Sequence, residues 1–379
     1  MIIKNANVYT EEGKFEKQDI YTKGSLFVKT EKEADGDEVI DGEGCFAVPG
    51  LTDIHFHGCM GYDFCDGTEE AITNMAEYEA SIGVTSIVPA TMTLGEDRLE
   101  GICKTAAAYA KTAHNDKAAD LCGINMEGPF IAESKKGAQN GAFIRKPDIA
   151  MFDKLNAASG HMVKLIAIAP EVEGAMEFIA AKKNDTVLSL AHMAADYETA
   201  MKAFENGATH VTHLYNAMNP FSHRAPGPIA AAADSAAEVE LICDGVHIHP
   251  AVVRTTFKMF GDDKVILISD SMMATGLEDG DYSLGGQAVK VVGNLATLKD
   301  GTIAGSATNL MDCVRTVVLK MNIPLESAVK CAAVNSAKSV GIYDKYGSIT
   351  PGKTANVVLL KKDDLALESV VLRGKRLQQ

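Results

Sequence analysis

Two histidines in the segment VPGLTDIHFHG, residues 48–58, are spaced so that both can bind the same metal ion. His55 and His57 lie two residues apart, and on a β-strand such side chains point to one face. Neutral imidazole is a common ligand of first-row divalent metals. Gly58 follows the pair directly and is typical of the end of a strand. The segment therefore predicts half of a metal site, with two unrelated strand histidines as the alternative.

Further metal-binding side chains follow along the chain, most of them at the end of a short apolar run. Histidine, glutamate and aspartate bind divalent ions and also act as general acids and bases. With the first pair, they are enough to hold one or two divalent ions and to leave a position for water. Such donors accept zinc, iron, manganese or cobalt, so the identity of the metal stays open. Four histidines, one glutamate and one aspartate would suffice, and the predicted metal ligands are His55, His57, Glu127, His192 and His213; the other polar residues at strand ends are Asp244, His247 and Asp270.

The apolar runs that carry these residues have the length and composition of buried parallel strands. Helical patterns separate them, among others at residues 69–83, 96–113 and 197–207. Eight strand–helix units in series predict an α/β fold, a closed (β/α)8 TIM-like barrel, in which all strands end on one face. We expect the metal-binding side chains to converge on that face. The predicted strands are residues 51–57, 85–91, 121–128, 163–171, 186–192, 210–216, 239–245 and 264–270.

Both ends of the chain differ in pattern from its middle. Residues 1–47 and 342–379 contain short alternating runs interrupted by glycine and aspartate, which favours strands. We expect the two ends to pair into one small β-sandwich domain built from both termini, and residues 48–341 to form the barrel. The remaining predicted elements are hairpin strands within 281–291 and 294–305 and helices at about 307–321 and 325–339.

The other histidines fit structural roles better than metal binding. His210 lies three residues before His213, so on one strand the two point to opposite faces, and we expect His210 in the core or toward the helices. His114 and His161 lie in helix-to-strand connections, where solvent exposure is expected. His249 is expected to cap a helix, with a contact to ligand as the alternative.

Composition indicates a soluble protein. The 379 residues accommodate a barrel of about 250 residues and a smaller unit. A formal net charge of -15 argues against nucleic acid and against an anionic membrane as partners. No run of 18 apolar residues and no signal-peptide pattern is present. The eight scattered cysteines, without a CxxC pair, indicate reduced thiols, so we expect a cytoplasmic protein.

The segment GSITPGKT, residues 347–354, matches the phosphate-loop pattern GxxxxGK[ST]. That loop binds phosphate only where a strand leads into it and a helix leaves it. The residues that follow, ANVVLLKK, have the pattern of a strand. We therefore expect a turn between two strands of the small domain, with nucleotide binding as the alternative.

Taken together, these motifs resemble the amidohydrolase superfamily and, within it, the family of N-acetylglucosamine-6-phosphate deacetylases. The resemblance covers essentially the whole chain. EGPF and HLYNAM are distinctive for the deacetylases, because many other amidohydrolases have a lysine where Glu127 stands. The matching segments are PGLTDIHFHG (49–58), NMEGPFI (125–131), KKGAQN (135–140), AHMAAD (191–196), THLYNAMNPFSHRAPG (212–227), ICDGVHIHP (242–250), ISDSMMATG (268–276), IAGS (303–306) and GSITPGKTANVVLL (347–360).

The resemblance implies roles for individual residues. Glu127, His192 and His213 match the core metal ligands of the family, and Asp270 matches its catalytic acid and base. Some members lack the first histidine pair and hold a single metal, so the presence of that pair here implies a second ion. Gln139 stands where many members have a histidine that contacts the sugar, which puts that contact in doubt. The residues that match substrate-binding segments are Ala138, Gln139, Asn216, Ala217, Arg224, Asp244, Gly245, Val246, His247, Ile303, Ala304 and Gly305.

A homodimer that acts on a small sugar phosphate is also implied. In the family, the arginine that matches Arg224 reaches into the site of the neighbouring subunit. A divalent metal lowers the pKa of bound water to about 7, and the hydroxide would attack the acetamide carbonyl. The metal and His247 would stabilise the oxyanion, while Asp270 serves first as general base and then as general acid. The alternatives are another amidohydrolase activity, such as a cyclic amidase or deaminase, and a non-catalytic barrel scaffold.

Overall fold

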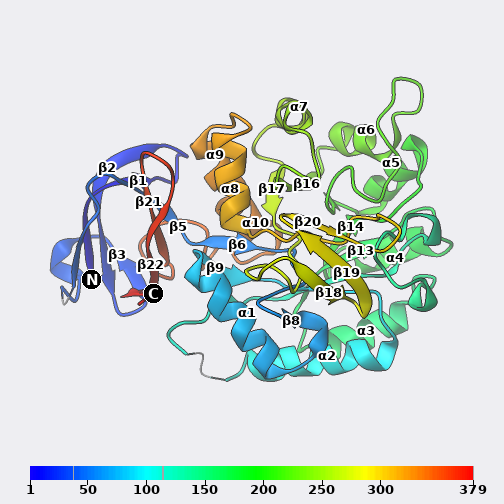
Figure 1. The fold of residues 1–379 in the computed structure, drawn as a ribbon, viewed down its shortest axis with the longest axis horizontal. Coiled ribbons are helices and arrows are strands. Elements are labelled where there is room, and N and C mark those ends of the chain that lie inside the picture. The colour runs from blue at the N-terminus through cyan, green and yellow to red at the C-terminus, as the bar shows by residue number, and fades with distance from the viewer. Residues whose placement is uncertain (37, 113–114, 379) are drawn as a thin grey trace.

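The computed structural model describes residues 1–36, 38–112 and 115–378. Its ribbon contains a small β unit, which holds both chain ends, beside a larger unit of strands and helices (Figure 1). The small unit is assembled from the first and last parts of the chain, drawn in blue and red. This arrangement confirms the predicted fold class, a barrel with a small β-sandwich unit built from both termini.

Parallel strands form most of the barrel wall. Seven of them make one sheet in the order β10-β12-β13-β14-β15-β16-β17, and three others make the sheet β11-β9-β6. The strands are mostly apolar and buried on both faces, as expected where helices cover a parallel sheet. Their bounds are β6 Leu51–Asp53, β9 Val84–Ile87, β10 Ala90–Thr91, β11 Asp120–Leu121, β12 Ile124–Phe130, β13 Val163–Ile168, β14 Val187–Leu190, β15 His210–Val211, β16 Glu238–Ile242 and β17 Val265–Ile268.

Backbone hydrogen bonds from the first strand segment join the two sheets. On one side, the His57 amide donates to the Ser271 carbonyl at 2.7 Å, just beyond β17. On the other side, the Ala90 amide donates to the Phe56 carbonyl, also at 2.7 Å. The segment after β6 therefore lies in the barrel wall between the second and eighth strand segments, and its hydrogen bonds to both close the barrel.

Helices cover the outside of the barrel (Figure 1). In α1, the Thr68 hydroxyl caps the N-terminus by accepting from the Ala71 amide, and an apolar face that includes Ile72 and Met75 is buried. The bounds are α1 Glu69–Ser81, α2 Glu96–Tyr109, α3 Ile149–Ala158, α4 Ala175–Lys182, α5 Tyr197–Asn206, α6 Gly227–Asp234, α7 Pro250–Phe260, α8 Leu310–Leu319, α9 Leu325–Val329 and α10 Asn335–Ser339, with a π-helical turn Lys330–Val334 between the last two and 3-10 turns at Glu31–Glu33, Phe64–Asp66, Glu133–Lys135 and Gly141–Phe143.

Several predicted strands are shorter or divided in the structure. The run 85–91 is split into β9 and β10 around Pro89, which has no amide hydrogen to donate to a ladder. The run 210–216 is a strand only over β15, because the backbone turns sharply from His213 onward. Hydrophobic pattern located the strands, but these backbone turns interrupt the regular pairing that defines their ends.

Antiparallel hairpins accompany the barrel. One three-stranded sheet, β18-β19-β20, follows the last barrel strand, where the sequence predicts hairpins. A two-stranded hairpin, β7-β8, follows the first histidine pair. Their bounds are β7 Gly58–Cys59, β8 Tyr62–Asp63, β18 Gly280–Leu284, β19 Gln287–Val292 and β20 Leu295–Thr297.

The small unit is one mixed sheet with its own apolar core. Its order is β23-β22-β21-β5-β1-β2-β3, and β4 pairs with β1. Buried side chains from both chain ends, such as Ile3, Phe27 and Val357, form the core. The division of the chain at 47/48 and 341/342 stays a prediction. The bounds are β1 Ile2–Tyr9, β2 Phe15–Lys23, β3 Leu26–Val28, β4 Val39–Asp41, β5 Cys45–Pro49, β21 Val357–Lys361, β22 Leu367–Leu372 and β23 Lys375–Arg376.

The phosphate-loop match at 347–354 leads into a strand, as the sequence predicts. After Thr354 the chain continues into β21, whereas a phosphate loop requires a helix at this point. Within the loop, the Gly352 amide donates to the Phe27 carbonyl at 2.9 Å, which ties it to β3. The segment is therefore a connection of the small sheet.

All eight cysteines are free thiols, and seven of them are buried. Free thiols agree with the reduced cysteines expected from the sequence, and the buried ones act as small core residues. Among the described residues, no helix is both long enough and apolar enough to cross a membrane.

One arginine joins the small unit to the barrel. Arg373, at the end of β22, donates to the Asp120 carboxylate at 2.8 Å and to the carbonyls of Ala118 and Asn115 at 3.1 and 3.0 Å. Arg373→Met should lower the free energy of unfolding by about 1–3 kcal/mol, because the partly buried acceptors lose their charged donor. Urea unfolding followed by circular dichroism would measure this loss.

Lys375→Met is the matched control on the same turn. Its ammonium pairs with the Asp116 carboxylate at 2.7 Å, but both side chains are largely exposed, so little stability should be lost. Equal effects of the two substitutions would contradict the tethering role of Arg373.

Candidate active site

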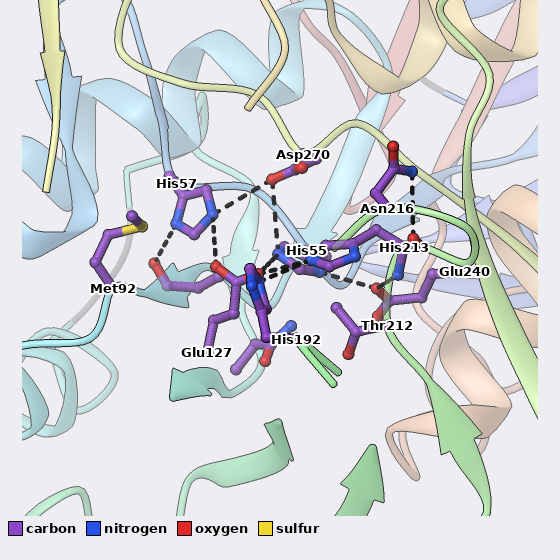
Figure 2. Close-up of polar contacts among 12 residues, drawn as sticks. His55, His57, Met92, Glu127, His192, Thr212, His213, Asn216, Glu240 and Asp270 are labelled. Carbon is purple, nitrogen blue, oxygen red and sulfur yellow. Dashed lines mark hydrogen bonds and ion pairs between the residues drawn. The ribbon is translucent and has the colours of Figure 1, made fainter. Parts of the chain in front are cut away.

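A buried carboxylate lies where several strand ends of the barrel meet. Glu127, in β12, is only 3% exposed. Its Oε1 lies 3.0 Å from His192 Nε2 and 3.0 Å from His213 Nε2, and its Oε2 lies 3.2 Å from His57 Nε2 (Figure 2). Side chains from strands that are far apart in the sequence therefore converge on one acidic group.

His55 and Asp270 complete the cluster. His55 Nε2 lies 3.6 Å from Glu127 Oε1 and 3.7 Å from Asp270 Oδ1. Asp270 Oδ1 also lies 3.3 Å from His57 Nε2. Two groups of three have donor atoms within 4.8 Å of one another, namely His55, His57 and Glu127, and Glu127, His192 and His213. We call them the first-strand triad and the core triad; Glu127 belongs to both.

The backbone turns sharply at three of these residues. His192, His213 and Asp270 have φ values of 45°, 30° and 49°, in the left-handed region that non-glycine residues rarely adopt. Such conformations cost on the order of 1–3 kcal/mol each and persist where the surrounding structure holds them. At these positions the chain leaves the barrel wall and directs the side chain toward Glu127.

Hydrogen bonds to the outer ring nitrogens orient the imidazoles. His192 Nδ1 bonds to the Lys135 carbonyl at 2.9 Å, and His57 Nδ1 bonds to the Ala90 carbonyl at 3.3 Å. A carbonyl can only accept, so the proton resides on Nδ1 and Nε2 is left facing the cluster. This is the arrangement that metal-binding histidines adopt in proteins.

Burial and charge act in opposite directions on the carboxylates. Burial raises the pKa of Glu127, but hydrogen bonds from His192, His213 and His57 outweigh it and hold the pKa well below its ordinary value. Burial likewise raises the pKa of Asp270, and the His57 hydrogen bond together with the nearby imidazoles lowers it overall. Both carboxyl groups are therefore ionised at neutral pH.

The same carboxylates raise the pKa values of the neighbouring imidazoles of His55 and His57. Burial lowers the pKa of His55, but Glu240, Glu127 and Asp270 outweigh burial and raise it to about 9. The pKa of His57 is raised well above its ordinary value, because Asp270 and Glu127 again outweigh burial. The buried acidic groups thus require positive charge nearby, and protons on the imidazoles supply it when no metal does.

The donor set fits a divalent metal. His55 Nε2 is buried and has no hydrogen-bond partner among the described residues, although it faces two carboxylates. Nitrogen and carboxylate donors that approach one another this closely are typical of zinc and related ions. A cation bound here would be coordinated by His55 Nε2, and its positive charge would balance the negative charge of the two carboxylates.

A cavity of about 340 Å³ opens onto this cluster. That volume falls in the range of small-molecule sites, on the order of 300–1,000 Å³. Its wall includes five residues of the cluster, Glu127, His57, His192, His213 and Asp270, whereas His55 is fully buried beneath them. The predicted substrate residues that line it are Ala138, Gln139, Asn216, Ala217, His247, Ile303 and Gly305.

Other predicted residues lie outside the cavity wall. Asp244 belongs to neither triad; its carboxylate bonds to His247 Nδ1 at 2.7 Å and accepts from the amides of Val246 and His247. The strand-end pair Asp244 and His247 is therefore separate from the two triads, and Asp244 orients His247, which lines the cavity. Ala304 is fully buried, and Arg224 is exposed. The predicted residues outside the wall are Arg224, Asp244, Gly245, Val246 and Ala304.

Gln139 contacts the central carboxylate. Its side-chain amide donates to Glu127 Oε2 at 2.5 Å, and its side-chain oxygen accepts from the Thr93 amide at 2.7 Å. The amide is therefore held on both sides and nearly fully buried. In this chain, the residue at the position that is often histidine orients Glu127.

Sequence reasoning missed several residues of the site. Lys135 lines the cavity and is the only lysine or arginine among its described wall residues. Its ammonium donates to the Met218 carbonyl at 3.3 Å. Glu240 bonds to His55 from beneath the cluster at 2.9 Å. A charged residue inside the apolar run VELIC was the available signal for Glu240, whereas the lysine-rich start of KKGAQN was the signal for Lys135.

The histidines set aside from the sequence behave as expected where the structure describes them. His210 is fully buried, and its Nδ1 bonds to the Ser189 hydroxyl at 2.8 Å. The His249 side chain accepts from the Ala251 amide at 3.2 Å and caps α7. His161 is exposed. His114 lies outside the described residues.

Comparison with known proteins decides the family. The model of the amidohydrolase family matches residues 46–377. The chain belongs to the amidohydrolase family. A curated relative, the N-acetylglucosamine-6-phosphate deacetylase of Bacillus subtilis, is 35% identical over 365 residues, which cover 96% of this chain and 90% of that protein. The resemblance seen in the motifs is thereby confirmed.

Two further relatives of this amidohydrolase are informative. The N-acetylgalactosamine-6-phosphate deacetylase of Escherichia coli is 32% identical over 329 residues, 86% of each chain. The structure of an aspartate-to-alanine mutant of N-acetyl-D-glucosamine-6-phosphate deacetylase from Mycobacterium smegmatis, in complex with N-acetyl-D-glucosamine-6-phosphate, has a TM-score of 0.92. It is 30% identical in sequence, and the match covers 100% of this chain and 99% of that one.

Metal binding by this amidohydrolase should depend on Glu127 more than on any other single ligand. In chelator-treated protein, zinc at about a hundredfold its Kd should raise the free energy of unfolding by about 2.7 kcal/mol. Glu127→Gln should remove most of this stabilisation, because the carboxylate belongs to both triads. Thermal unfolding with and without zinc measures the effect.

His161→Gln serves as the control, since it removes an exposed histidine outside the cluster and should leave the zinc-induced shift intact. A shift in Glu127→Gln as large as in the wild type would show that the metal binds elsewhere.

Proposed function

We propose that this amidohydrolase removes the acetyl group of N-acetylglucosamine 6-phosphate and produces glucosamine 6-phosphate and acetate. The observation that carries the proposal is the convergence of Glu127, His192, His213 and Asp270 at one cavity, in a chain whose relatives over nearly its full length are such deacetylases. An ionised carboxylate beside a cluster of metal donors is the arrangement needed to hydrolyse an amide.

The core triad would hold one divalent ion, and the first-strand triad supports a second. When bound, a divalent ion supplies Lewis acidity, which polarises the amide carbonyl and lowers the pKa of water. Zinc, iron, manganese and cobalt all suit these donors. A complete ligand set also argues against a non-catalytic scaffold, since such a protein would have no need to retain it.

Asp270 is placed to transfer protons. It is ionised and lies on the cavity wall, where a water that attacks the carbonyl carbon can give it a proton. When the carbon–nitrogen bond breaks, the same carboxyl returns that proton to the leaving amine nitrogen. One residue thus serves as general base and then as general acid, and no proton is gained or lost.

His247, on the wall of the same cavity, would act on the substrate. Because Asp244 holds Nδ1, the remaining ring nitrogen is free for the substrate, either at the carbonyl oxygen or at the phosphate. Asn216 and Ala217 line the same wall. Lys135 supplies a cation from within the subunit, and such groups bind phosphate through charge-assisted hydrogen bonds.

We also infer a homodimer in which Arg224 reaches the neighbouring cavity. Arg224 is exposed, and no hydrogen bond or ion pair involves its guanidinium within the part of the chain that the structure describes. A free guanidinium suits bidentate binding of a phosphate on a second subunit.

N-acetylgalactosamine 6-phosphate is a second candidate substrate. It differs from the first only in the configuration of one hydroxyl group, and the Escherichia coli relative that acts on it is 32% identical. Release of acetate from both sugars, at matched concentrations, would rank them.

The metal-loaded protein should release acetate from N-acetylglucosamine 6-phosphate, and Asp270→Asn should reduce kcat by about 10²–10⁴-fold. The amide cannot accept the proton of the attacking water, yet it keeps the shape of the side chain. Acetate release and metal content should be measured on the same samples. Loss of metal in Asp270→Asn would assign Asp270 a ligand role instead, and absence of acetate from the wild type would reject the proposed substrate.

Arg224→Ala should raise KM for N-acetylglucosamine 6-phosphate much more than KM for unphosphorylated N-acetylglucosamine, because only the first carries the anion. The unphosphorylated sugar is the internal control. Equal changes in both KM values would show that Arg224 does not bind phosphate.

Mixing the two variants tests whether the arginine acts across subunits. A dimer of one Arg224→Ala and one Asp270→Asn subunit keeps one site with both residues intact if Arg224 acts on its partner. Random reassociation should then restore about a quarter of the wild-type low-KM activity. No restoration would place Arg224 in its own subunit's site.

A further inference from the structure

Beneath the metal-ligand cluster lies a buried carboxylate, Glu240, that the proposed reaction does not use. Glu240 is in the middle of β16, its side chain is 0% exposed, and the neighbours Val239 and Leu241 are apolar and buried. An ionised carboxylate at such a position is costly unless it is well hydrogen-bonded. The hydrogen-bond partners of Glu240 therefore indicate its structural role.

We propose that Glu240 is a positioning residue that ties the two metal-ligand triads together by holding His55 and the His213 turn with one carboxylate. The inference rests on the proposed metal site, but not on the identity of the substrate. Glu240 would fix the orientation of two metal-ligand residues, His55 and His213.

One oxygen of Glu240 receives a hydrogen bond from each triad. Glu240 Oε2 accepts from His55 Nδ1 at 2.9 Å and from the backbone amide of His213 at 3.1 Å (Figure 2). His55 belongs to the first-strand triad and His213 to the core triad. Residues 158 positions apart in the sequence are thus fixed relative to each other by one side chain.

The bond to His55 determines which ring nitrogen is available. An ionised carboxylate can only accept, so it keeps the ring proton on Nδ1. His55 Nε2 is then directed at Glu127 Oε1 and Asp270 Oδ1, at 3.6 and 3.7 Å, and has no hydrogen-bond partner among the described residues. Glu240 therefore presents this nitrogen for a cation.

The bond to His213 supports a strained turn. The φ of His213 is 30°, and the amide of the next residue, Leu214, donates to the Glu240 backbone carbonyl at 2.9 Å. Glu240 therefore holds two successive amides, one with its side chain and one with its main chain. Side-chain loss would release the first and loosen the His213 ring.

The second carboxylate oxygen of Glu240 also faces a histidine ring. Its other oxygen, Oε1, lies 3.8 Å from His210 Nε2, and neither atom has a hydrogen-bond partner among the described residues. His210 in turn bonds to the Ser189 hydroxyl at 2.8 Å. Polar contacts thus continue from the ligand cluster into the barrel interior, with Glu240 at the junction.

The test measures zinc affinity by competition with a chromophoric chelator, in the absence of any substrate. Glu240→Leu removes both accepted hydrogen bonds and should weaken binding of one zinc by about 10–100-fold. His55→Gln defines that ion, since it removes the ligand itself. We expect Glu240→Leu to weaken the same zinc that His55→Gln weakens.

Two further variants separate positioning from stability. Glu240→Gln keeps an oxygen that can accept both hydrogen bonds, so it should retain zinc with less than about a tenfold loss. Glu79→Leu removes another fully buried carboxylate, in α1, whose oxygens have no hydrogen-bond partner among the described residues, and should leave zinc affinity unchanged. Unchanged affinity in Glu240→Leu or in His55→Gln, or an equal loss in Glu79→Leu, would overturn the proposal.

A measurement on the wild type covers the case in which Glu240→Leu does not fold. Histidine-selective ¹⁵N NMR of the zinc-loaded protein, in which a ligand imidazole is neutral, should show His55, identified by its absence in His55→Gln, protonated at Nδ1. Protonation at Nε2 alone would overturn the proposal. Because no sugar is present in either experiment, failure of the deacetylase assignment and failure of the Glu240 role are distinguishable.

Discussion

The arrangement of the site depends on one buried anion, the carboxylate of Glu127. It is 3% exposed, and three imidazole nitrogens lie within 3.2 Å of its oxygens. In a low-dielectric interior such a charge is stable only with compensating charge and hydrogen bonds. The imidazoles supply this compensation, and a bound divalent cation would add to it. Because the carboxylate belongs to both triads, the two prospective metal positions are not independent.

The stability of the barrel offsets the energetic cost of bringing these side chains together. Parallel strands with apolar side chains bury a large surface, so the fold can hold left-handed backbone at His192, His213 and Asp270. A second set of contacts then prevents the ligands from rotating: carbonyls hold His57 and His192, and the Glu240 carboxylate holds His55. These contacts fix the orientation of the side chains, and fixed dipoles and charges are what electrostatic catalysis requires.

The cavity wall carries two kinds of chemical group. Glu127 and Asp270, with the imidazoles around them, suit a metal and the exchange of protons. Lys135 and His247 add hydrogen-bonding groups to the same wall, and in the proposed homodimer the exposed Arg224 would add another from the second subunit. A net charge of -15 is compatible with this, because exposed charges farther away than about 8 Å are largely screened at physiological salt.

The amino-acid sequence alone determined the strand–helix alternation, the two-ended small unit and the ligand types at the strand ends, because hydrophobic period and residue chemistry are local properties. It placed His55, His57, Glu127, His192, His213 and Asp270 in one cluster through the rule that parallel strands end on one face. Only the tertiary structure decided that Asp244 serves His247, that Gln139 holds Glu127, and that Glu240 and Lys135 belong to the site. Those assignments depend on how the closed barrel aligns side chains across its interior, and no periodic pattern in one segment encodes the distance to another.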